Sequence, residues 1–554
     1  MSAVLMGGVA VYAGGRQVHN DSRPAGKETE QDPTLAGGSL VWDQENLHSL
    51  VWGSNRSKVL SPTSRQRDVI RSPAVAAWLD GVALRDLQFH ETHAACIDAN
   101  GDVYQWGDGF FGDLAANSPP KLTLRGKNIV QLQLTGDKAY ALSASGHIYV
   151  FAANVIDQVL TPGAPTPASD GWWGTGWLWG EDENIDFAQV TSNDKLNRRE
   201  KFTSIAAGQS HLLALTSKGR AFAHPINKSA NSHGQLGFQK FAVPDPAAAV
   251  TGKEAHLHLD LIPKSLSDPF WKASRSVRAT SEAAPEDNLA NVNDKNIRFC
   301  PYIYEIPSLR GVEFVQIAAG SRTSFGRTSN GRVLGWGANE FGQLGLGSSI
   351  TLDTITVPSE VVLWRATPSR VSCECTDVTA GGDLSAFIVS RGDARASSHT
   401  DLLMSGNGQY GGLGNNVFTT AQSNASRVKA VSGLQQYNDK TQQMDPIKPN
   451  AVTIAPSGSV LVSINSAADS QGVGGSDLFV WGRNFDSELG NGKKSSLAGP
   501  ARLEVPEGER MMLMERKAKE VRDLHGRVWK RGVRVKQHVA AGYGTSAVYW
   551  KIVD

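Results

Sequence analysis

Cysteine and histidine, the residues that most often bind metals or act as nucleophiles and bases, are few and scattered in this sequence. Cys373 and Cys375 form a Cys-x-Cys pair, while Cys96 and Cys300 lie far from it along the chain. A zinc site needs two Cys or His pairs at ligand spacing, and the sequence offers no second pair to complete this one. We therefore expect buried or free thiols and no metal site.

The sequence also lacks the motifs of catalysis and cofactor binding. The glycine-rich strings GFFGDL and GQLG do not stand between a strand and a helix, so they do not form the phosphate-binding loop of a nucleotide fold. There is no Gly-x-Ser-x-Gly elbow and no catalytic dyad. The sequence predicts no catalytic residue, no cofactor and no enzymatic activity.

The composition is that of a glycine-rich, nearly neutral chain. Of 554 residues, 57 are glycine, and 55 Lys and Arg stand against 54 Asp and Glu, which gives a net charge of +1. This charge argues against the basic domain that chromatin or RNA binders usually carry. Apolar residues make up 40%, enough for a sizeable core. The length alone would suggest three or four domains of about 150 residues.

A repeated unit accounts for the glycines. Its clearest copy runs from Val315 to Gly347 and contains a small-residue strand, an apolar strand, an Asn-Gly turn, a strand ending in Trp336-Gly337 and a Gly-Gln-Leu-Gly loop. Asn-Gly between two strand-like runs is a strong hairpin signal. Further copies, some of them weaker, occupy residues 84–115, 130–154, 201–238, 378–414 and 452–490.

Each end of the chain carries one half of a unit. Residues 49–60 hold a Trp-Gly strand without its small-residue strand, and residues 538–550 hold a small-residue strand with nothing after it. Joined, the halves make a seventh unit, which is how the ring of a β-propeller closes. We predict an all-β, seven-bladed β-propeller whose N- and C-terminal strands share one blade.

Two kinds of residue are expected to hold this ring together. Small residues suit the innermost strands, where neighbouring blades converge, and the Trp-Gly strand would bury an aromatic ring between blades. His90 and His93 are spaced like paired ligands, but they fall within a repeat and are expected to be structural. The structural residues expected from the repeat are Gly208, Gly320, Gly381, Gly542, Trp52, Trp106, Trp336 and Trp481.

The repeat resembles that of the regulator of chromosome condensation family, whose seven-bladed propellers are built from AAG…WG.N..GQLG units. The resemblance covers residues from about 39 to 554; it is strong at 315–347 and degraded at 130–154 and 378–414. The long insertions, the split blade and the neutral charge are most similar to the mitochondrial fungal members of the family.

The resemblance implies a function in protein interaction. The mitochondrial fungal members are associated with the inner membrane and with assembly of the respiratory chain, particularly the cytochrome bc1 complex. This implies a non-enzymatic scaffold in the mitochondrial inner membrane or matrix that binds other proteins, with peripheral membrane association and without nucleic acid. Two alternatives stay open. Animal relatives imply mitochondrial ribosome biogenesis, and the nuclear founding member implies guanine-nucleotide exchange on a small GTPase.

Three insertions are expected between or within the blades, at about 160–200, 239–310 and 506–536. The first holds four tryptophans before an acidic run, which predicts either a plug on a blade edge or channel or a protein-binding patch. The second is rich in Pro and Ala and reads as a loop excursion. The tryptophans are Trp172, Trp173, Trp177 and Trp179.

The third insertion has ten Lys and Arg and five Asp and Glu. Apolar residues spaced by three and four predict a short helix over about 507–524. Its basic end could face RNA, an acidic protein or anionic lipid, or form a solvated charged surface. The candidate residues there are Arg527, Lys530, Arg531 and Arg534. Residues 1–38 are expected to form an apolar stub and a polar linker before the propeller of 39–554.

Overall fold

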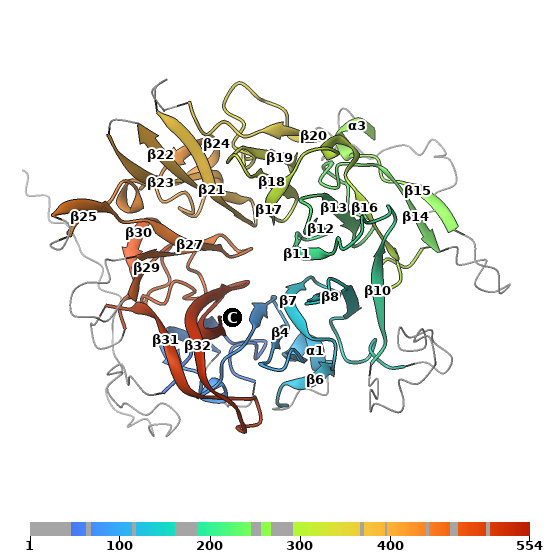
Figure 1. The fold of residues 1–554 in the computed structure, drawn as a ribbon, viewed down its shortest axis with the longest axis horizontal. Coiled ribbons are helices and arrows are strands. Elements are labelled where there is room, and N and C mark those ends of the chain that lie inside the picture. The colour runs from blue at the N-terminus through green and yellow to red at the C-terminus, as the bar shows by residue number, and fades with distance from the viewer. Residues whose placement is uncertain are drawn as a thin grey trace, which may run out of the picture. The chain divides into compact units, whose positions relative to one another are not determined.

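Four-stranded antiparallel sheets follow one another along the unit Ser39–Asp554 (Figure 1). The fold is taken from a computed structural model, whose first 45 residues, including the expected stub and linker, lie outside the described part. The structure describes residues 46–62, 68–112, 118–160, 185–244, 256–267, 292–365, 371–393, 396–438, 442–465, 475–505 and 510–553.

The described strands group into seven blades of four strands, in agreement with the predicted propeller. Blade 1 contains β3 (Asp86–Phe89), β4 (Ala94–Ile97), β5 (Val103–Trp106) and β6 (Lys121–Leu124); blade 2 contains β7 (Ile129–Leu134), β8 (Lys138–Ser143), β9 (Ile148–Ala152) and β10 (Phe187–Ser192). Blade 3 contains β11 (Phe202–Ala207), β12 (His211–Thr216), β13 (Ala221–Pro225) and β16 (Tyr302–Glu305). Blade 4 contains β17 (Phe314–Ala319), β18 (Thr323–Thr328), β19 (Val333–Ala338) and β20 (Thr354–Glu360).

Blades 5 to 7 complete the ring. Blade 5 contains β21 (Ser372–Gly381), β22 (Leu384–Asp393), β23 (Ala396–Gly408) and β24 (Thr419–Arg427); blade 6 contains β27 (Pro449–Ile454), β28 (Ser459–Asn465), β29 (Gly475–Gly482) and β30 (Leu497–Arg502). Blade 7 contains β32 (Val528–Ala541), β33 (Thr545–Ile552), β1 (Leu50–Ser54) and β2 (Val69–Val75), so the two chain ends share it. The innermost strands contact one another in the closed order β3, β7, β11, β17, β21, β27, β32 and back to β3.

In four of the seven blades, a tryptophan of the repeat joins the blade to the one before it. Trp52, Trp106, Trp336 and Trp481 are completely buried. Their indole N–H groups donate to carbonyl oxygens in the loop after the third strand of the preceding blade: Val59 O and Glu488 O at 2.8 Å, and Gln235 O and Gly412 O at 2.9 Å. Each ring thus fills the space between two blades and also satisfies a buried carbonyl.

Glycine is required where blades or strands approach closely. A Cβ on Gly381, at the axial end of β21, would lie 2.2 Å from the carbonyl oxygen of Ile454 in blade 6. Gly337, after Trp336, has φ of +108°, and a Cβ there would lie 2.4 Å from Arg322 O. Any side chain at these two positions would push strands apart, since such distances are inside van der Waals contact.

The loop after the third strand of four blades owes its shape to one asparagine. The side-chain oxygen of Asn339 accepts the backbone N–H of Leu344, five residues on, at 3.3 Å. Asn55, Asn231 and Asn484 make the same bond to Leu60, Leu236 and Leu489. This local bond explains the Asn and Leu of the repeated motif, because it fixes the turn whose carbonyl, one residue before the leucine, accepts a hydrogen bond from the next blade.

The predicted helix over 507–524 is wrong. Met512–Arg522 form strand β31, which pairs with β32 on one side and, through its first residues, with β29 of blade 6. The turn at Asp523–Gly526, held by the Asp523 carboxylate accepting the N–H groups of His525 and Arg527, joins β31 to β32. Available strand edges on both sides supplied backbone partners that outweighed the 3–4 spacing of apolar residues.

Helices in the described residues are short: α1 (Asp108–Phe111), α3 (Lys264–Ser267), η1 (Ala77–Leu79), η6 (Pro307–Leu309) and η7 (Lys429–Val431). No helix of this part of the chain has the length and apolar character needed to span a bilayer. Two hairpins stand outside the blades, β14 (Lys240–Pro244) with β15 (His256–Asp260) and β25 (Gln435–Asn438) with β26 (Gln443–Pro446).

The first two predicted insertions each include a blade strand. β10 lies within 160–200 and β16 within 239–310, and the two also pair with each other in parallel, which joins blades 2 and 3. Both are outer strands, with half-exposed residues and no Trp-Gly marker. The repeat pattern lies in the three inner strands of each blade, so it did not identify these outer strands as parts of blades.

Candidate interaction surface

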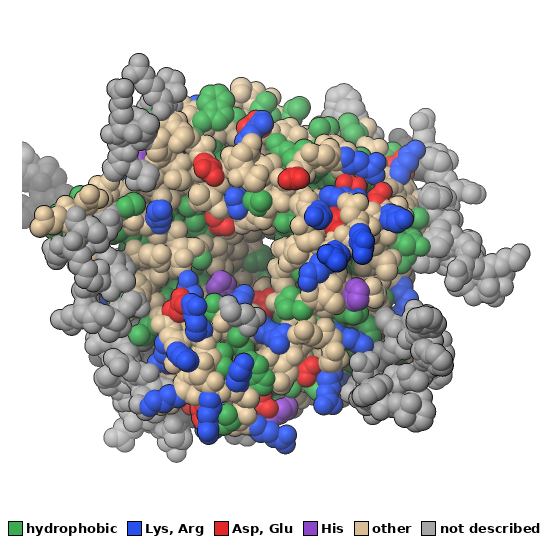
Figure 2. All heavy atoms as spheres, viewed as in Figure 1, with side chains coloured by type: hydrophobic (Ala, Val, Ile, Leu, Met, Phe, Trp, Pro, Cys, Tyr) green, Lys and Arg blue, Asp and Glu red, His purple; other side chains and the backbone are tan. Residues whose placement is uncertain are grey.

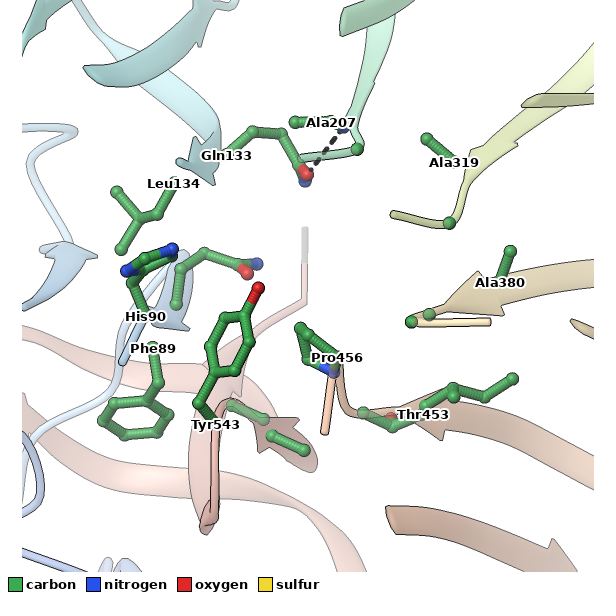
Figure 3. Close-up of a pocket in the computed structure, with 18 of the residues that line it drawn as sticks. Phe89, His90, Gln133, Leu134, Ala207, Ala319, Ala380, Thr453, Pro456 and Tyr543 are labelled. Atoms are coloured by element: carbon green, nitrogen blue, oxygen red, sulfur yellow. Dashed lines mark hydrogen bonds between the residues drawn. The ribbon is translucent and has the colours of Figure 1, made fainter. Parts of the chain in front are cut away.

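The axial channel is the first candidate site, because residues from all seven blades line it. It is a cavity of about 290 Å³ lined by the inner strands of all seven blades. Figure 3 shows Ala207, Ala319 and Ala380 on its walls, with the Tyr543 hydroxyl pointing into the opening. The Gln133 side chain reaches the next blade, where its Oε1 accepts the N–H of Ala207 at 3.0 Å. The walls combine small residues with larger polar and aromatic ones, among them Asp86, His90 and Tyr543, and the Gln133 amide serves to join blades.

The imidazoles beside the channel are held neutral. His90 and His93 stack with ring centres 4.7 Å apart, and Tyr543 meets His90 edge-on at 5.1 Å. Burial lowers the pKa of His93 to about 3 and also lowers the pKa of His90. Burial raises the pKa of Tyr543. These groups lack a nucleophile to activate, and their environment disfavours the charged forms.

Three of the four thiols are buried, and burial makes them unreactive. Burial raises the pKa of Cys300 and of Cys375 to about 12 and that of Cys96 well above its ordinary value, so thiolate is scarce. All four cysteines are free. In the described residues no group of three His, Cys, Asp or Glu side chains is placed to hold a metal ion.

The predicted basic residues lie on a two-stranded ribbon made of β31 and the first part of β32, residues 512–536. Arg527 follows its turn, and Lys530, Arg531 and Arg534 lie on β32. One face of the ribbon is covered: Ala518 and Val535 are buried against Leu47 and Trp550. The other face carries Glu515, Lys517 and Arg534, all exposed, with Lys517 directly opposite Arg534.

The ribbon is fixed at both ends. Met512 pairs with Asp477 of blade 6, and at the far end the N–H of Arg522 donates to Gly81 O at 2.9 Å. The His525 Nε2 lies 3.3 Å from the Tyr104 hydroxyl of blade 1. The ribbon therefore reaches from blade 6 across blade 7 to blade 1, over the place where the ring closes.

Sequence reasoning found the basic residues that follow the turn and missed Lys517 before it. Lys517 lies on the same exposed face as Arg534, directly opposite it. The signal for it was the turn at Asp523–Gly526, which would have revealed two paired strands. The predicted tryptophan patch, residues 172–179, lies outside the described residues.

Comparisons with known proteins agree with the repeat. Profiles of the regulator of chromosome condensation (RCC1) repeat match residues 314–343 and 330–388. The chain is 22% identical to Protein FMP25, mitochondrial, of Saccharomyces cerevisiae over 488 residues, which cover 86% of this chain and 69% of that protein. It is 22% identical to the Regulator of chromosome condensation of Xenopus laevis over 432 residues, 74% of this chain and 86% of that protein.

Solved structures share the fold. Prp20p of Saccharomyces cerevisiae superposes with a TM-score of 0.53 at 15% identity and covers 92% of each chain. Human WBSCR16 gives a TM-score of 0.53 at 15% identity, with 91% of this chain and 99% of that chain covered. At this identity the likeness speaks for the propeller architecture alone.

Proposed function

Because the chain carries regulator of chromosome condensation repeats on a propeller of the same fold as Prp20p, we propose that it is a non-enzymatic protein-interaction scaffold acting in mitochondria. Its role is in assembly of the respiratory chain, in particular of the cytochrome bc1 complex. The observation that carries this proposal is the alignment with the mitochondrial yeast protein, which runs over 86% of this chain. The finer role rests on the resemblance to the mitochondrial fungal members.

The chemistry of the described residues supports a binding role over catalysis. The axial channel is lined by many small residues, and the imidazoles of His90 and His93 beside it are neutral because they are buried. The buried thiols have pKa values raised by burial. A ring of this kind offers its faces and loops to other proteins.

Guanine-nucleotide exchange on a small GTPase is the second candidate. It is favoured by the similarity to the Xenopus laevis protein over 74% of this chain, and by the Prp20p structure, whose description names binding to Gsp1p and histones.

The test combines localisation with affinity purification of the full chain carrying a C-terminal tag. We expect the tagged protein in mitochondria, with subunits or assembly intermediates of the cytochrome bc1 complex recovered with it after mild detergent extraction. A tagged mitochondrial matrix protein of similar abundance serves as the control. Loss of the protein should lower assembled bc1 complex on native gels.

Other outcomes would replace the proposal. Recovery of mitochondrial ribosomal proteins without respiratory-chain subunits would favour ribosome biogenesis. Acceleration of labelled guanine-nucleotide release from a small GTPase by the purified protein would favour the exchange function.

A further inference from the structure

We propose that the exposed face and turn of the β31–β32 ribbon bind the surface of an anionic lipid bilayer. Residues 512–536 hold nine Lys and Arg against three Asp and Glu, a net charge of +6 in a chain whose total is +1. Figure 2 shows Lys and Arg side chains gathered where Figure 1 places β31 and β32. Charge is therefore distributed unevenly over the protein, and the excess of cations is concentrated at this ribbon.

The kind of cation left unpaired favours a diffuse anionic surface. The guanidinium groups of Arg534 and Arg522 are engaged by Glu515 at 2.5 Å and by Glu520 at 2.8 Å. No ion pair given for the described residues includes Lys517, Lys530 or Lys536, nor does one include Arg527. Three of these four cations are lysines, whose ammonium groups are flexible point charges suited to a diffuse anionic surface, whereas bidentate recognition of a carboxylate on a protein would rely on arginine forks.

The apolar residues near the turn also favour a membrane surface as the partner. Val528 is 46% exposed between Arg527 and the half-buried Trp529. The Lys530 ammonium lies 5.8 Å from the Trp529 ring centre, and the ring also packs against the ribbon's buried cluster. A ring engaged in this way is a poor stacking platform for the bases of RNA, while Trp with flanking cations is typical of the membrane interface.

The ribbon is also held rigidly by its attachments to neighbouring parts of the ring. Its attachments to Asp477, Gly81 and Tyr104 hold the cations in place, so little ordering is required on binding. The axial channel, which is the cavity described above, lies elsewhere and is lined by the inner strands. Each Lys or Arg near an anionic leaflet changes partitioning about five-fold, so four unpaired cations give several hundred-fold, a reversible association.

The test is flotation of the purified full chain with vesicles of phosphatidylcholine containing about one third phosphatidylserine, at about 0.1 M salt. The ribbon variant carries Lys517→Gln, Arg527→Gln, Lys530→Gln and Lys536→Gln. The control variant carries Lys240→Gln, Lys429→Gln, Lys493→Gln and Lys494→Gln, four exposed lysines outside the ribbon, with the same change in net charge. Thermal unfolding of both variants checks that they are folded.

We expect the wild type and the control variant to float with anionic vesicles and not with pure phosphatidylcholine, and the ribbon variant to bind at least a hundred-fold more weakly. Equal loss in both variants, no loss in the ribbon variant, or binding to neutral vesicles would overturn the proposal. Binding of an RNA oligonucleotide or a polyglutamate peptide in place of anionic vesicles would also overturn it. The proposal does not depend on the mitochondrial function, because vesicle binding and bc1 co-purification are measured separately.

Discussion

The junction between blades 3 and 4 and the junction between blades 6 and 7 use the same pair of donors on one carbonyl. Trp336 and Ser324 both donate to Gln235 O, at 2.9 and 2.7 Å. Trp52 and Ser546 both donate to Glu488 O, at 2.8 and 2.9 Å. In the first junction the donors lie on the consecutive strands β18 and β19, and in the second they come from opposite ends of the chain.

The two junctions differ in what surrounds this shared bond. At the closing junction, bringing the chain ends together costs loop-closure entropy, and the β31–β32 ribbon adds pairing between blades 6 and 7 and contact with blade 1. The acceptor residue also changes from Gln235 to Glu488, whose side chain is buried. Closure therefore repeats the chemistry of an ordinary junction, reinforced by one additional element.

Deleting residues 538–554 should have the largest effect on this comparison. It removes β33 and the end of β32, so β1 loses its partner and the cluster around Trp52, Val539 and Val548 opens to water. We expect no cooperative unfolding transition by calorimetry and rapid proteolysis. A truncated chain that melts like the full-length protein would disprove closure by the chain ends.

Replacing the two tryptophans compares the junctions directly. Trp52→Ala and Trp336→Ala should each lower the free energy of unfolding by about 3–5 kcal/mol, because both rings are completely buried. Urea unfolding of the two variants measures the difference. Similar values would mean that the closing junction is as tightly packed as an internal one, and a much smaller loss for Trp52→Ala would mean that it is looser.

Exchanging the acceptor side chains addresses the Gln-to-Glu difference. Glu488 Oε2 accepts the N–H of Asp486 at 2.8 Å, and Arg483 lies 3.9 Å away. Burial outweighs these interactions and raises the pKa of the Glu488 carboxyl. Gln235 has no such charge, and its amide donates to Ser229 O at 3.3 Å.

The expected result has opposite signs at the two sites. Glu488→Gln should stabilise the fold at pH 7 by about 1 kcal/mol, and Gln235→Glu should destabilise it by about 1–3 kcal/mol. A carboxyl with a raised folded-state pKa stabilises the fold fully below its unfolded pKa of about 4.5, and this contribution is lost as pH rises through the folded value. Unfolding measured from pH 4 to 8 should show the Glu488→Gln advantage growing with pH; an advantage independent of pH would contradict this explanation.

The smallest effects are expected from the serines. Ser546→Ala should cost about 1 kcal/mol, because the tryptophan N–H still satisfies the carbonyl when the hydroxyl is lost. Ser324→Ala should cost more, about 1–3 kcal/mol, because it also leaves the buried His211 Nε2 without the hydroxyl that lies 2.9 Å away. Denaturant unfolding of the single variants and of each Ser–Trp double variant gives the coupling. A coupling free energy between Ser and Trp at one junction and none at the other would show that the same hydrogen-bond geometry does not contribute equally to stability at both.

Much of this architecture could be read from the sequence because the repeat is enforced locally. Asn339 and Leu344 shape their loop within six residues, and Gly337 marks a backbone conformation that other residues avoid. The candidate interaction surface was harder to predict from the sequence. The basic residues of 527–536 were visible, but Lys517 joined them only through pairing of β31 with β32.

By itself the sequence determined one ring in place of three or four domains, with the halves at 49–60 and 538–550 forming one blade. This was possible because glycine, asparagine and tryptophan act at fixed positions within each unit. The tertiary structure decided the rest. Met512–Arg522 became a strand because β29 and β32 offered edges to pair with, and β10 and β16 joined blades through a parallel contact that no local pattern encodes. Strand pairing depends on which edges are available in space, and spacing along one segment does not contain that information.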